Sequence, residues 1–336
     1  MDASGFPVPG ASGRLLERLD AGGATVRRFA PLPSLSSGHE RPITADQTHR
    51  SVVVDERVVV KWFRPPMPPP HPALDVLAHL DAVGFERTAK PYAAVLDGDA
   101  LTAMVTAYLP DAVDGYHWCV AAVVDGQDIG RGLGTITADL HAALATPSRE
   151  LPVPVRIEPD PDRHPRALAA LDEALAIDPA LAPLADRLRA DLAALSALTP
   201  SPRLRIHGDL HVGQVLKWRD GYAVIDFDGN PTVASDSPQP LARDFAQMRT
   251  SIEHVGRIAL RRRALPPDWV RAAVAEFHAA YVERLTDHGV AHLFDEDLVQ
   301  PFAVEQECRE LIYAARFLPR WRYAPIGVLT SWYGEF

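Results

Sequence analysis

One string of residues, His207 to Gln214, constrains this 336-residue chain more than any other feature. Two strand-like runs follow it, around an Asp-Gly pair at 220–221 that suits a tight hairpin turn because Gly accepts positive φ. Antiparallel pairing across that turn sets Asp226 opposite Val215 and brings it beside Gln214. A carboxylate and an amide oxygen at one end of a hairpin suit Mg²⁺, a hard cation that few protein oxygens hold. The string therefore predicts a metal site.

The spacing of Asp209 and Gln214 is that of a phosphoryl-transfer loop. In protein kinases an Asp accepts the proton of the substrate hydroxyl, an amide residue five positions later helps hold metal, and a second Asp follows a short hairpin. Here Gln214 lies five residues after Asp209, and Asp226 ends the hairpin. His-Gly-Asp alone occurs by chance in many loops, but the combination of three features indicates function.

This region resembles the aminoglycoside-phosphotransferase and choline-kinase superfamily, whose members are relatives of the protein kinases. It is most similar to the maltokinases, in which the amide is typically Gln within an HGDLHxGQ-type string. The resemblance implies an α+β, bilobal protein-kinase-like fold. We expect an N-terminal antiparallel-sheet lobe over residues 1–108 and a mainly helical C-terminal lobe over residues 109–336.

The same resemblance assigns roles to the motif residues, with ATP and Mg²⁺ as cofactors. Asp209 is expected to be the catalytic base, and Gln214 with Asp226 is expected to bind Mg²⁺. His211 and Asp228 are expected to lie close to the acceptor.

Composition limits the alternatives. Charged residues make up 23% and hydrophobic residues 47% of the chain, without an apolar run long enough to cross a bilayer or a signal core, so we expect a cytoplasmic protein. Two cysteines, Cys119 and Cys308, are too few for a disulfide framework, and neither belongs to a Cys-x-x-Cys pair. A net charge of −10 argues against nucleic-acid binding. Small-molecule partners and a monomer are favoured.

Valine-rich runs at 51–62 predict another hairpin, with a two-residue turn at 55–56. That turn places Lys61 opposite Arg50 and next to the preceding loop, residues 44–49. In a kinase-like lobe this loop covers the nucleotide phosphates and the strand lysine contacts them. A Lys that ends a valine strand is more often a solvated edge, but its position ahead of the catalytic string favours nucleotide binding.

The loop has no Gly-x-Gly-x-x-Gly pattern. Maltokinase-like proteins use a polar loop here, and by that resemblance Gln47, Thr48 and His49 belong to the nucleotide site. After a proline-rich connector, residues 73–83 show helical spacing. Asp75 on this helix is a candidate to brace Lys61, and a surface acid favoured by the helix dipole is an equally good interpretation.

Two further strand runs, Tyr92 to Leu96 and Leu101 to Ala107, precede a chain segment that should leave the sheet at Leu109. By kinase logic this segment is the hinge, where adenine meets backbone amides near Ala107 and Leu109. A glycine-rich string at 130–134 superficially resembles a dinucleotide loop, but no strand runs into it, and an ordinary helix is expected.

Acceptor residues must lie in the C-terminal lobe. Asp244 matches a maltokinase-like Arg-Asp string, and a structural salt bridge with Arg243 or Arg249 explains it equally well. In the last long helix, Gln306, Glu310 and Tyr313 are spaced by four and three residues and share one face. These side chains could bind sugar hydroxyls with Trp321 as a stacking surface, although a solvated helix is the simpler interpretation of the pattern alone.

The Gln306-Glu307-Cys308 run, with Tyr-Ala-Ala-Arg at 313–316 and Leu-Pro-Arg-Trp at 318–321, resembles the bacterial glucosamine kinases, a maltokinase-like branch. Glu310 or Glu307 would suit the protonated amino group of glucosamine. The resemblance implies ATP- and Mg²⁺-dependent phosphorylation of D-glucosamine to glucosamine 6-phosphate.

Three alternatives stay open. One is a maltokinase, against which the shorter N-terminal part weighs. Another is an aminoglycoside phosphotransferase, against which the final helix weighs. The third is a nucleotide-binding pseudokinase scaffold, against which the retained motif residues weigh.

Overall fold

The structure is a computed structural model that describes residues 8–20, 26–43, 49–219, 221–229, 237–262, 265 and 268–334. The chain divides into two compact units, each made of three segments. Unit 1 comprises Met1–Ala112, Ser148–Pro152 and Lys217–Pro231, and unit 2 comprises Val113–Pro147, Val153–Leu216 and Thr232–Phe336.

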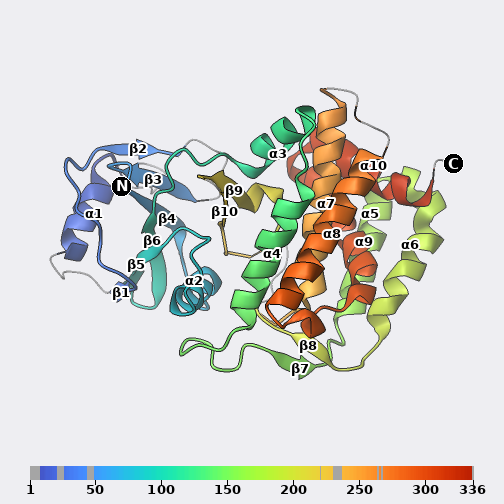
Figure 1. The fold of residues 1–336 in the computed structure, drawn as a ribbon, viewed down its shortest axis with the longest axis horizontal. Helices are drawn as coiled ribbons and strands as arrows, with labels where there is room; N and C mark the ends of the chain where they lie inside the picture. The colour runs from blue at the N-terminus through green and yellow to red at the C-terminus, as the bar shows by residue number, and fades with distance from the viewer. Residues whose placement is uncertain are drawn as a thin grey trace. The chain divides into compact units, whose positions relative to one another are not determined.

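Unit 1 is built on a six-stranded antiparallel sheet in the order β1-β5-β6-β4-β3-β2 (Figure 1). Helix α1 (Ala11–Asp20) packs against β3, and α2 (Pro72–Ala82) packs against β5. The leucines of α1 join the alternating valines of β3 and β4 in one hydrophobic cluster. The strands are β1 (Val26–Arg28), β2 (Glu40–Pro42), β3 (Arg50–Val54), β4 (Val58–Met67), β5 (Pro91–Asp97) and β6 (Ala100–Ala107).

The β3–β4 hairpin forms, but its predicted register is wrong by one residue. Val54 pairs with Val58, so the turn has three residues, and Lys61 lies opposite Ser51 instead of Arg50. The reason is Asp55, whose backbone has a φ of 53° and whose carboxylate accepts backbone N–H groups of residues 36–39. These hydrogen bonds stabilise the charged carboxylate in a left-handed position that most residues avoid.

Unit 2 is mainly helical, and α7 packs against α3, α4, α8, α9 and α10. The chain breaks at Asp178–Pro179: α5 ends before this pair, and the Asp178 carboxylate accepts the N–H of Ala180 in the short turn that follows. The helices are α3 (Gly115–Val124), α4 (Gly130–Ala145), α5 (Arg163–Ile177), α6 (Ala185–Leu192), α7 (Leu241–Leu260), α8 (Trp269–Asp287), α9 (Val299–Phe317) and α10 (Tyr323–Tyr333).

Two short strand pairs complete the structure. β7 (Arg156–Glu158) pairs with β8 (Ser201–Arg203) ahead of the catalytic string, and β9 (Val215–Trp218) pairs with β10 (Gly221–Val224) behind it. The predicted α+β class is confirmed by the sheet of unit 1 and the helices of unit 2. Among the described residues, no helix combines the length and the apolar character that a membrane crossing requires.

The glycine-rich string at 130–134 lies in α4, and its glycines serve helix packing. Figure 1 shows α4 alongside α8. A Cβ on Gly130 would lie 2.3 Å from the backbone oxygen of Ala273, and one on Gly134 would lie 2.4 Å from that of Phe277. The two backbones approach so closely that no side chain fits between them, and this explains the string without a nucleotide.

This packing gives a stability prediction. Gly134→Ala should destabilise the protein by about 1–3 kcal/mol, because the added methyl group meets rigid backbone. The measurement is the midpoint of thermal unfolding followed by circular dichroism. The matched control is Gly13→Ala in α1, where the nearest atom to the new methyl is a Glu40 side-chain oxygen at 3.5 Å and stability should be kept or raised. Equal midpoints for Gly134→Ala and wild type would contradict the packing argument.

Candidate active site

In unit 1, Lys61 on β4 contacts two carboxylates of the metal-loop motif. Its Nζ lies 2.8 Å from Asp226 Oδ1 and 2.5 Å from Asp228 Oδ2. Burial disfavours the charged amine, but the negative charges of Asp228 and Asp226 outweigh burial and raise the pKa of Lys61. Asp228, which we predicted beside the acceptor, therefore forms an ion pair with Lys61.

The end of β10 is fixed to the rest of unit 1 by the segment before β5. Thr88 Oγ1 donates to the carbonyl oxygen of Val224 at 2.7 Å, and the Val224 N–H donates to Arg87 O at 2.9 Å. Asp226 follows with a φ of 65°, a left-handed conformation that turns the chain just after the strand. This local anchoring brings the Asp226 carboxylate to Lys61.

The predicted bracing of Lys61 by Asp75 is not found. The side chain of Asp75 is 53% exposed and lies 3.4 Å from the guanidinium of Arg27, in the first turn of α2. That position matches the surface interpretation, in which the helix dipole favours an acid. The counter-charge of Lys61 comes instead from the two aspartates after β10.

The nucleotide loop can be described only in part. Gln47 and Thr48 lie outside the described residues. The ring of His49 lies 4.9 Å from that of Phe63, and burial, assisted by the charge of Lys61, lowers the pKa of His49. A neutral imidazole beside the lysine adds no repulsion, and its Nδ1 is buried without a hydrogen-bond partner among the described residues. His49 is thus a candidate donor or acceptor for a ligand at Lys61.

The two predicted hinge residues differ in their backbone hydrogen bonds. The N–H of Ala107 donates to Lys90 O at 2.8 Å, so β-sheet pairing already uses it. The N–H of Leu109 follows the end of β6 and makes no hydrogen bond within the described chain. Of the two, Leu109 is the one whose N–H could donate to an adenine.

In unit 2, one face of α7 binds the catalytic loop along its length. Three polar side chains, spaced by three and four residues, point to this loop from successive turns. Asp244 accepts the N–H groups of His207 (2.8 Å) and Gly208 (2.9 Å), Gln247 Nε2 donates to Asp209 Oδ1 (2.7 Å), and Ser251 Oγ accepts the N–H of Val212 (3.1 Å). Sequence reasoning missed Gln247 and Ser251, although their spacing from Asp244 could have revealed them.

Asp244 is fully buried, and among the described residues Arg243 and Arg249 pair with Glu305 and Glu253 instead of with it. Burial raises its pKa, but the hydrogen bond and charge of His141, together with the loop amides, outweigh burial and hold the pKa below its usual range. His141 Nε2 lies 3.3 Å from the carboxylate, and its Nδ1 lies 2.7 Å from the hydroxyl of Tyr281. Asp244 is placed as an ionised anchor beneath the loop.

Helix α3 holds the other side of the same loop. Trp118 Nε1 donates to Val215 O at 2.8 Å, and a Cβ on Gly115 would lie only 1.6 Å from Val212 O, so the helix and loop backbones touch. The ring of Tyr116 lies 6.0 Å from that of His211. No sequence pattern pointed to these residues of α3, because their role depends on tertiary contact.

His211 lies between the proposed base and the proposed metal ligand. Its Nδ1 accepts the N–H of Gly213 at 3.0 Å, so a neutral ring carries its proton on Nε2. That Nε2 lies 3.4 Å from the side-chain nitrogen of Gln214 and 4.0 Å from Asp209 Oδ2. Within unit 2 the structure therefore brings Asp209, His211 and Gln214 together.

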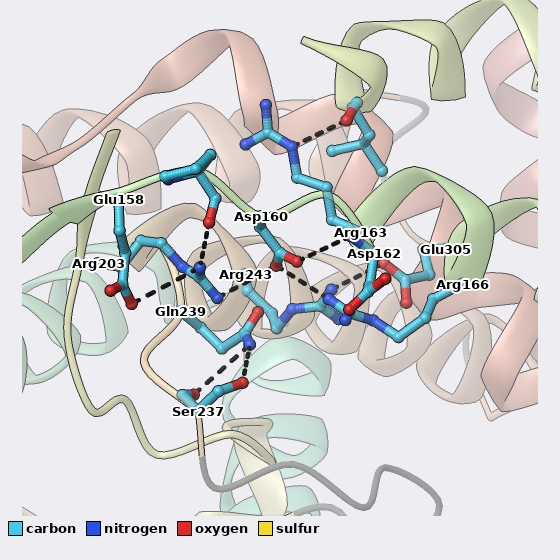
Figure 2. A network of polar contacts seen from close by, with 12 residues as sticks. Glu158, Asp160, Asp162, Arg163, Arg166, Arg203, Ser237, Gln239, Arg243 and Glu305 are labelled. Carbon is cyan, nitrogen blue, oxygen red and sulfur yellow. Dashed lines mark hydrogen bonds and ion pairs between the residues drawn. The ribbon is translucent and has the colours of Figure 1, made fainter. Parts of the chain in front are cut away.

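A buried ionic network fixes the chain just before the loop (Figure 2). Arg203 at the end of β8 contacts the Asp160 carboxylate at 3.2 Å and Pro159 O at 2.9 Å, and Arg166 reaches the same carboxylate at 3.0 Å. Next to it, Leu204 exchanges both backbone hydrogen bonds with Gln239. The strand before the loop therefore covers residues 201–203 instead of 204–206, and Leu204 adds a single bridge.

Helix α9 carries the predicted acceptor residues. Gln306 Nε2 donates to Glu310 Oε1 at 3.0 Å, which confirms that the two share a face. Burial, aided by the charges of Glu307 and Asp209 and opposed by the charge of His254, raises the pKa of Glu310 to about 7. Trp321 is packed edge-on against Tyr116 at 6.1 Å between ring centroids.

The other two predicted acceptor residues differ from Glu310. Glu307 is fully buried and contacts His254, whereas Tyr313 is 38% exposed and packs against Phe317 at 5.0 Å. Glu310, with Gln306 beside it and Asp209 acting on its charge, is the carboxylate most closely tied to the catalytic loop.

The donor set after β10 fits Mg²⁺. Asp226 and Asp228 meet at one ammonium, so their oxygens face a common cation position, and carboxylates with an amide such as Gln214 are hard oxygen donors. The described residues include no cluster of three or more His, Cys, Asp or Glu side chains that could hold a metal. Phosphate oxygens or water would complete the coordination shell of a Mg²⁺ ion held by these residues.

Comparisons with known proteins identify the family to which a chain with this site belongs. The model of the family described as "Phosphotransferase enzyme family" matches residues 39–229. The chain belongs to the phosphotransferase enzyme family. Within this family it is 36% identical to a glucosamine kinase of Streptacidiphilus jiangxiensis, over 97% of this chain and 81% of the relative. It is 34% identical to a glucosamine kinase of Mycolicibacterium smegmatis, over 97% and 88% respectively.

A solved structure agrees with these sequence relatives. It is described as a glucosamine kinase in complex with glucosamine, ADP and inorganic phosphate, and superposes with a TM-score of 0.80 at 34% identity, over 98% of this chain and 84% of that one. The kinase-like α+β fold and the resemblance to glucosamine kinases, both expected from the motifs, are confirmed for this phosphotransferase.

The buried anchor under the catalytic loop of this phosphotransferase gives a prediction. Asp244→Asn should reduce kcat by at least about tenfold and lower the unfolding temperature, because an amide cannot accept both loop N–H groups as a carboxylate does. The acceptor KM should stay close to the wild-type value, since Asp244 is fully buried beneath the loop. Steady-state kinetics and thermal unfolding measure both effects. A raised acceptor KM at unchanged kcat and stability would instead assign Asp244 to acceptor binding.

Proposed function

We propose that this protein is an ATP-dependent glucosamine kinase that transfers the γ-phosphoryl group to D-glucosamine and forms glucosamine 6-phosphate. The observation that carries the proposal is Glu310, a half-buried carboxylate beside the catalytic loop that has an amide partner but no ion pair with Lys or Arg among the described residues. A partly buried acid without such a counter-charge suits a ligand that brings one. Glucosamine brings an ammonium together with hydroxyl groups.

Asp209 is the proposed catalytic base. Gln247 donates to one of its carboxylate oxygens, and that bond fixes the orientation of the group. The other oxygen, which lies 4.0 Å from His211, is directed to the acceptor in this proposal. It accepts the proton of the sugar hydroxyl as the oxygen–phosphorus bond forms.

Lys61 and the aspartates after β10 are proposed to act on the phosphates. Lys61 binds the nucleotide, His49 and the Leu109 N–H contribute to its site, and Gln214, Asp226 and Asp228 hold Mg²⁺. The bound metal would neutralise phosphate charge during transfer. Without a nucleotide, the lysine and the two carboxylates neutralise one another, as their contacts in unit 1 illustrate.

The acceptor is proposed to lie between α9 and α3. Glu310 and Gln306 would form hydrogen bonds with the amino group and a neighbouring hydroxyl. Trp321 and Tyr116 would form an aromatic wall beside the sugar ring. Aromatic faces favour the C–H surface of a pyranose by dispersion and burial. This arrangement distinguishes amino sugars by charge and other hexoses by shape.

The first experiment is a coupled ADP-release assay over glucosamine, glucose, maltose and kanamycin with ATP and Mg²⁺. Glucosamine should give the highest kcat/KM. Asp209→Asn should lower kcat by at least about a hundredfold with all acceptors, because the variant keeps the shape but not the base. The control Asp75→Asn, at an exposed acid away from Lys61, should behave as wild type.

Each acceptor reports on a different alternative. Turnover of maltose without turnover of glucosamine would replace the proposal by a maltokinase, and preferred turnover of kanamycin by an aminoglycoside phosphotransferase. If no acceptor increased ADP release by wild type or Asp209→Asn, and both still bound nucleotide, the protein would be a pseudokinase scaffold.

A second prediction tests whether Glu310 binds the amino group. Glu310→Gln should raise the KM for glucosamine at least about tenfold, because the charge-assisted hydrogen bond to the ammonium is lost. The KM for glucose should change by no more than about threefold, since an amide still accepts a hydroxyl hydrogen bond. Steady-state kinetics with the two sugars give both values. Equal losses for both sugars would show that Glu310 does not read charge.

A further inference from the structure

A second buried acid lies one helical turn before Glu310. The Glu307 carboxylate is fully buried, and its Oε2 lies 3.1 Å from Nε2 of His254, a buried residue of α7. The other oxygen, Oε1, has no hydrogen-bond partner among the described residues. Such a pair is costly to bury unless it has a function or a compensating partner.

His254 also connects this pair to the proposed acceptor wall. Its ring packs edge-on against Trp321 at 5.6 Å between centroids, and Trp321 in turn packs against Tyr116. Since Glu307 and Glu310 lie three residues apart on α9, their side chains are neighbours on the helix surface. The pair therefore lies directly behind the carboxylate that we assign to the amino group.

The groups that face these carboxyls come from several elements. Burial raises the pKa of Glu307 and lowers that of His254, so burial favours the uncharged form of both partners, which share one proton across their contact. Glu253, Arg249 and Arg257 on α7 act on the pair, and Asp209 of the catalytic loop, Gln306 of α9 and His254 of α7 act on Glu310, with Tyr116 of α3 facing both acids.

We propose that His254 and Glu307 form a positioning pair that sets the charge of Glu310 and thereby the preference for a cationic acceptor. The inference rests on the proposed function. Neither residue needs to touch the sugar. Glu307 opposes ionisation of Glu310 by like charge, and His254 favours it when the ring holds the shared proton. Glu310 then ionises when an ammonium arrives and stays protonated beside a neutral sugar.

The opposite signs of the two charges allow a test that separates this role from a structural one. The readout is the ratio of kcat/KM for glucosamine to that for glucose between pH 5.5 and 8, about the neutral range in which Glu310 titrates. In wild type the ratio should fall as the pH drops below about 7, where Glu310 becomes protonated. Dividing by the value for glucose removes the pH effects on the transfer step that both sugars share.

Two variants should move the midpoint of this pH dependence, the pH at which the ratio is half of its plateau value, in opposite directions. Glu307→Gln removes a like charge, so the midpoint should shift to lower pH by roughly half a unit or more. His254→Gln removes the favourable charge, so the midpoint should shift to higher pH by a similar amount. A merely structural pair would give equal losses with both sugars and no shift. The control Arg316→Gln breaks an exposed ion pair on α9 with Glu173 and should leave the midpoint in place.

A measurement on the wild-type protein keeps the inference testable even if a variant does not fold. Glucosamine binding with ADP and Mg²⁺ is followed by calorimetry at pH 6 in buffers of different ionisation enthalpy. Binding should release about one proton, because the ammonium drives ionisation of a protonated carboxyl. Glucose should release none.

The outcomes distinguish the two proposals. A wild type that does not phosphorylate glucosamine overturns the proposed function and this inference with it. A wild type that does so, but releases no proton or gives variants whose midpoints stay in place or shift together, overturns the positioning pair alone.

Discussion

The buried carboxylate of Asp244 is the interaction on which the catalytic half of unit 2 depends. It accepts two consecutive backbone N–H groups at the start of the loop and is itself held by His141. A loop with several consecutive polar amides has no secondary structure to satisfy them, so a fixed acceptor must do so. Because Gln247 projects from the next turn of the same helix, the position of α7 also determines the orientation of Asp209.

Unit 1 solves a different electrostatic problem. Two aspartates that lie close together repel one another, and a half-buried amine needs a counter-charge. Lys61 between Asp226 and Asp228 meets both needs with one set of contacts. The arrangement resembles the charge balance of a loaded site, in which metal and phosphate take the places of amine and carboxylate. The site is therefore preorganised by mutual neutralisation.

The sequence predicted those features that depend on local spacing. The α+β class, the valine hairpin and the face shared by Gln306 and Glu310 follow from periodicity, and the structure bears them out. The one-residue error at the turn of β3 and β4 arose because the hydrogen bonds of Asp55 come from a distant loop. The contacts of α3 with the catalytic loop were missed for the same reason, since tertiary approach leaves no periodic trace.

Helix α9 illustrates how burial can turn ordinary acids into a selective site. Glu305 is neutralised by Arg243 and Arg309, whereas Glu307 shares its proton with His254. Among the described residues, the hydrogen-bond partner of Glu310 is the amide of Gln306. Glu305 and Glu307 are fully buried and Glu310 is half-buried, so the three acids differ in both burial and partners. An ionised Glu310 without a counter-charge is unfavourable, and in our proposal a cationic ligand supplies that counter-charge. A neutral sugar leaves Glu310 protonated and gains no charge-assisted hydrogen bond, so the preference for an amino sugar requires no steric barrier.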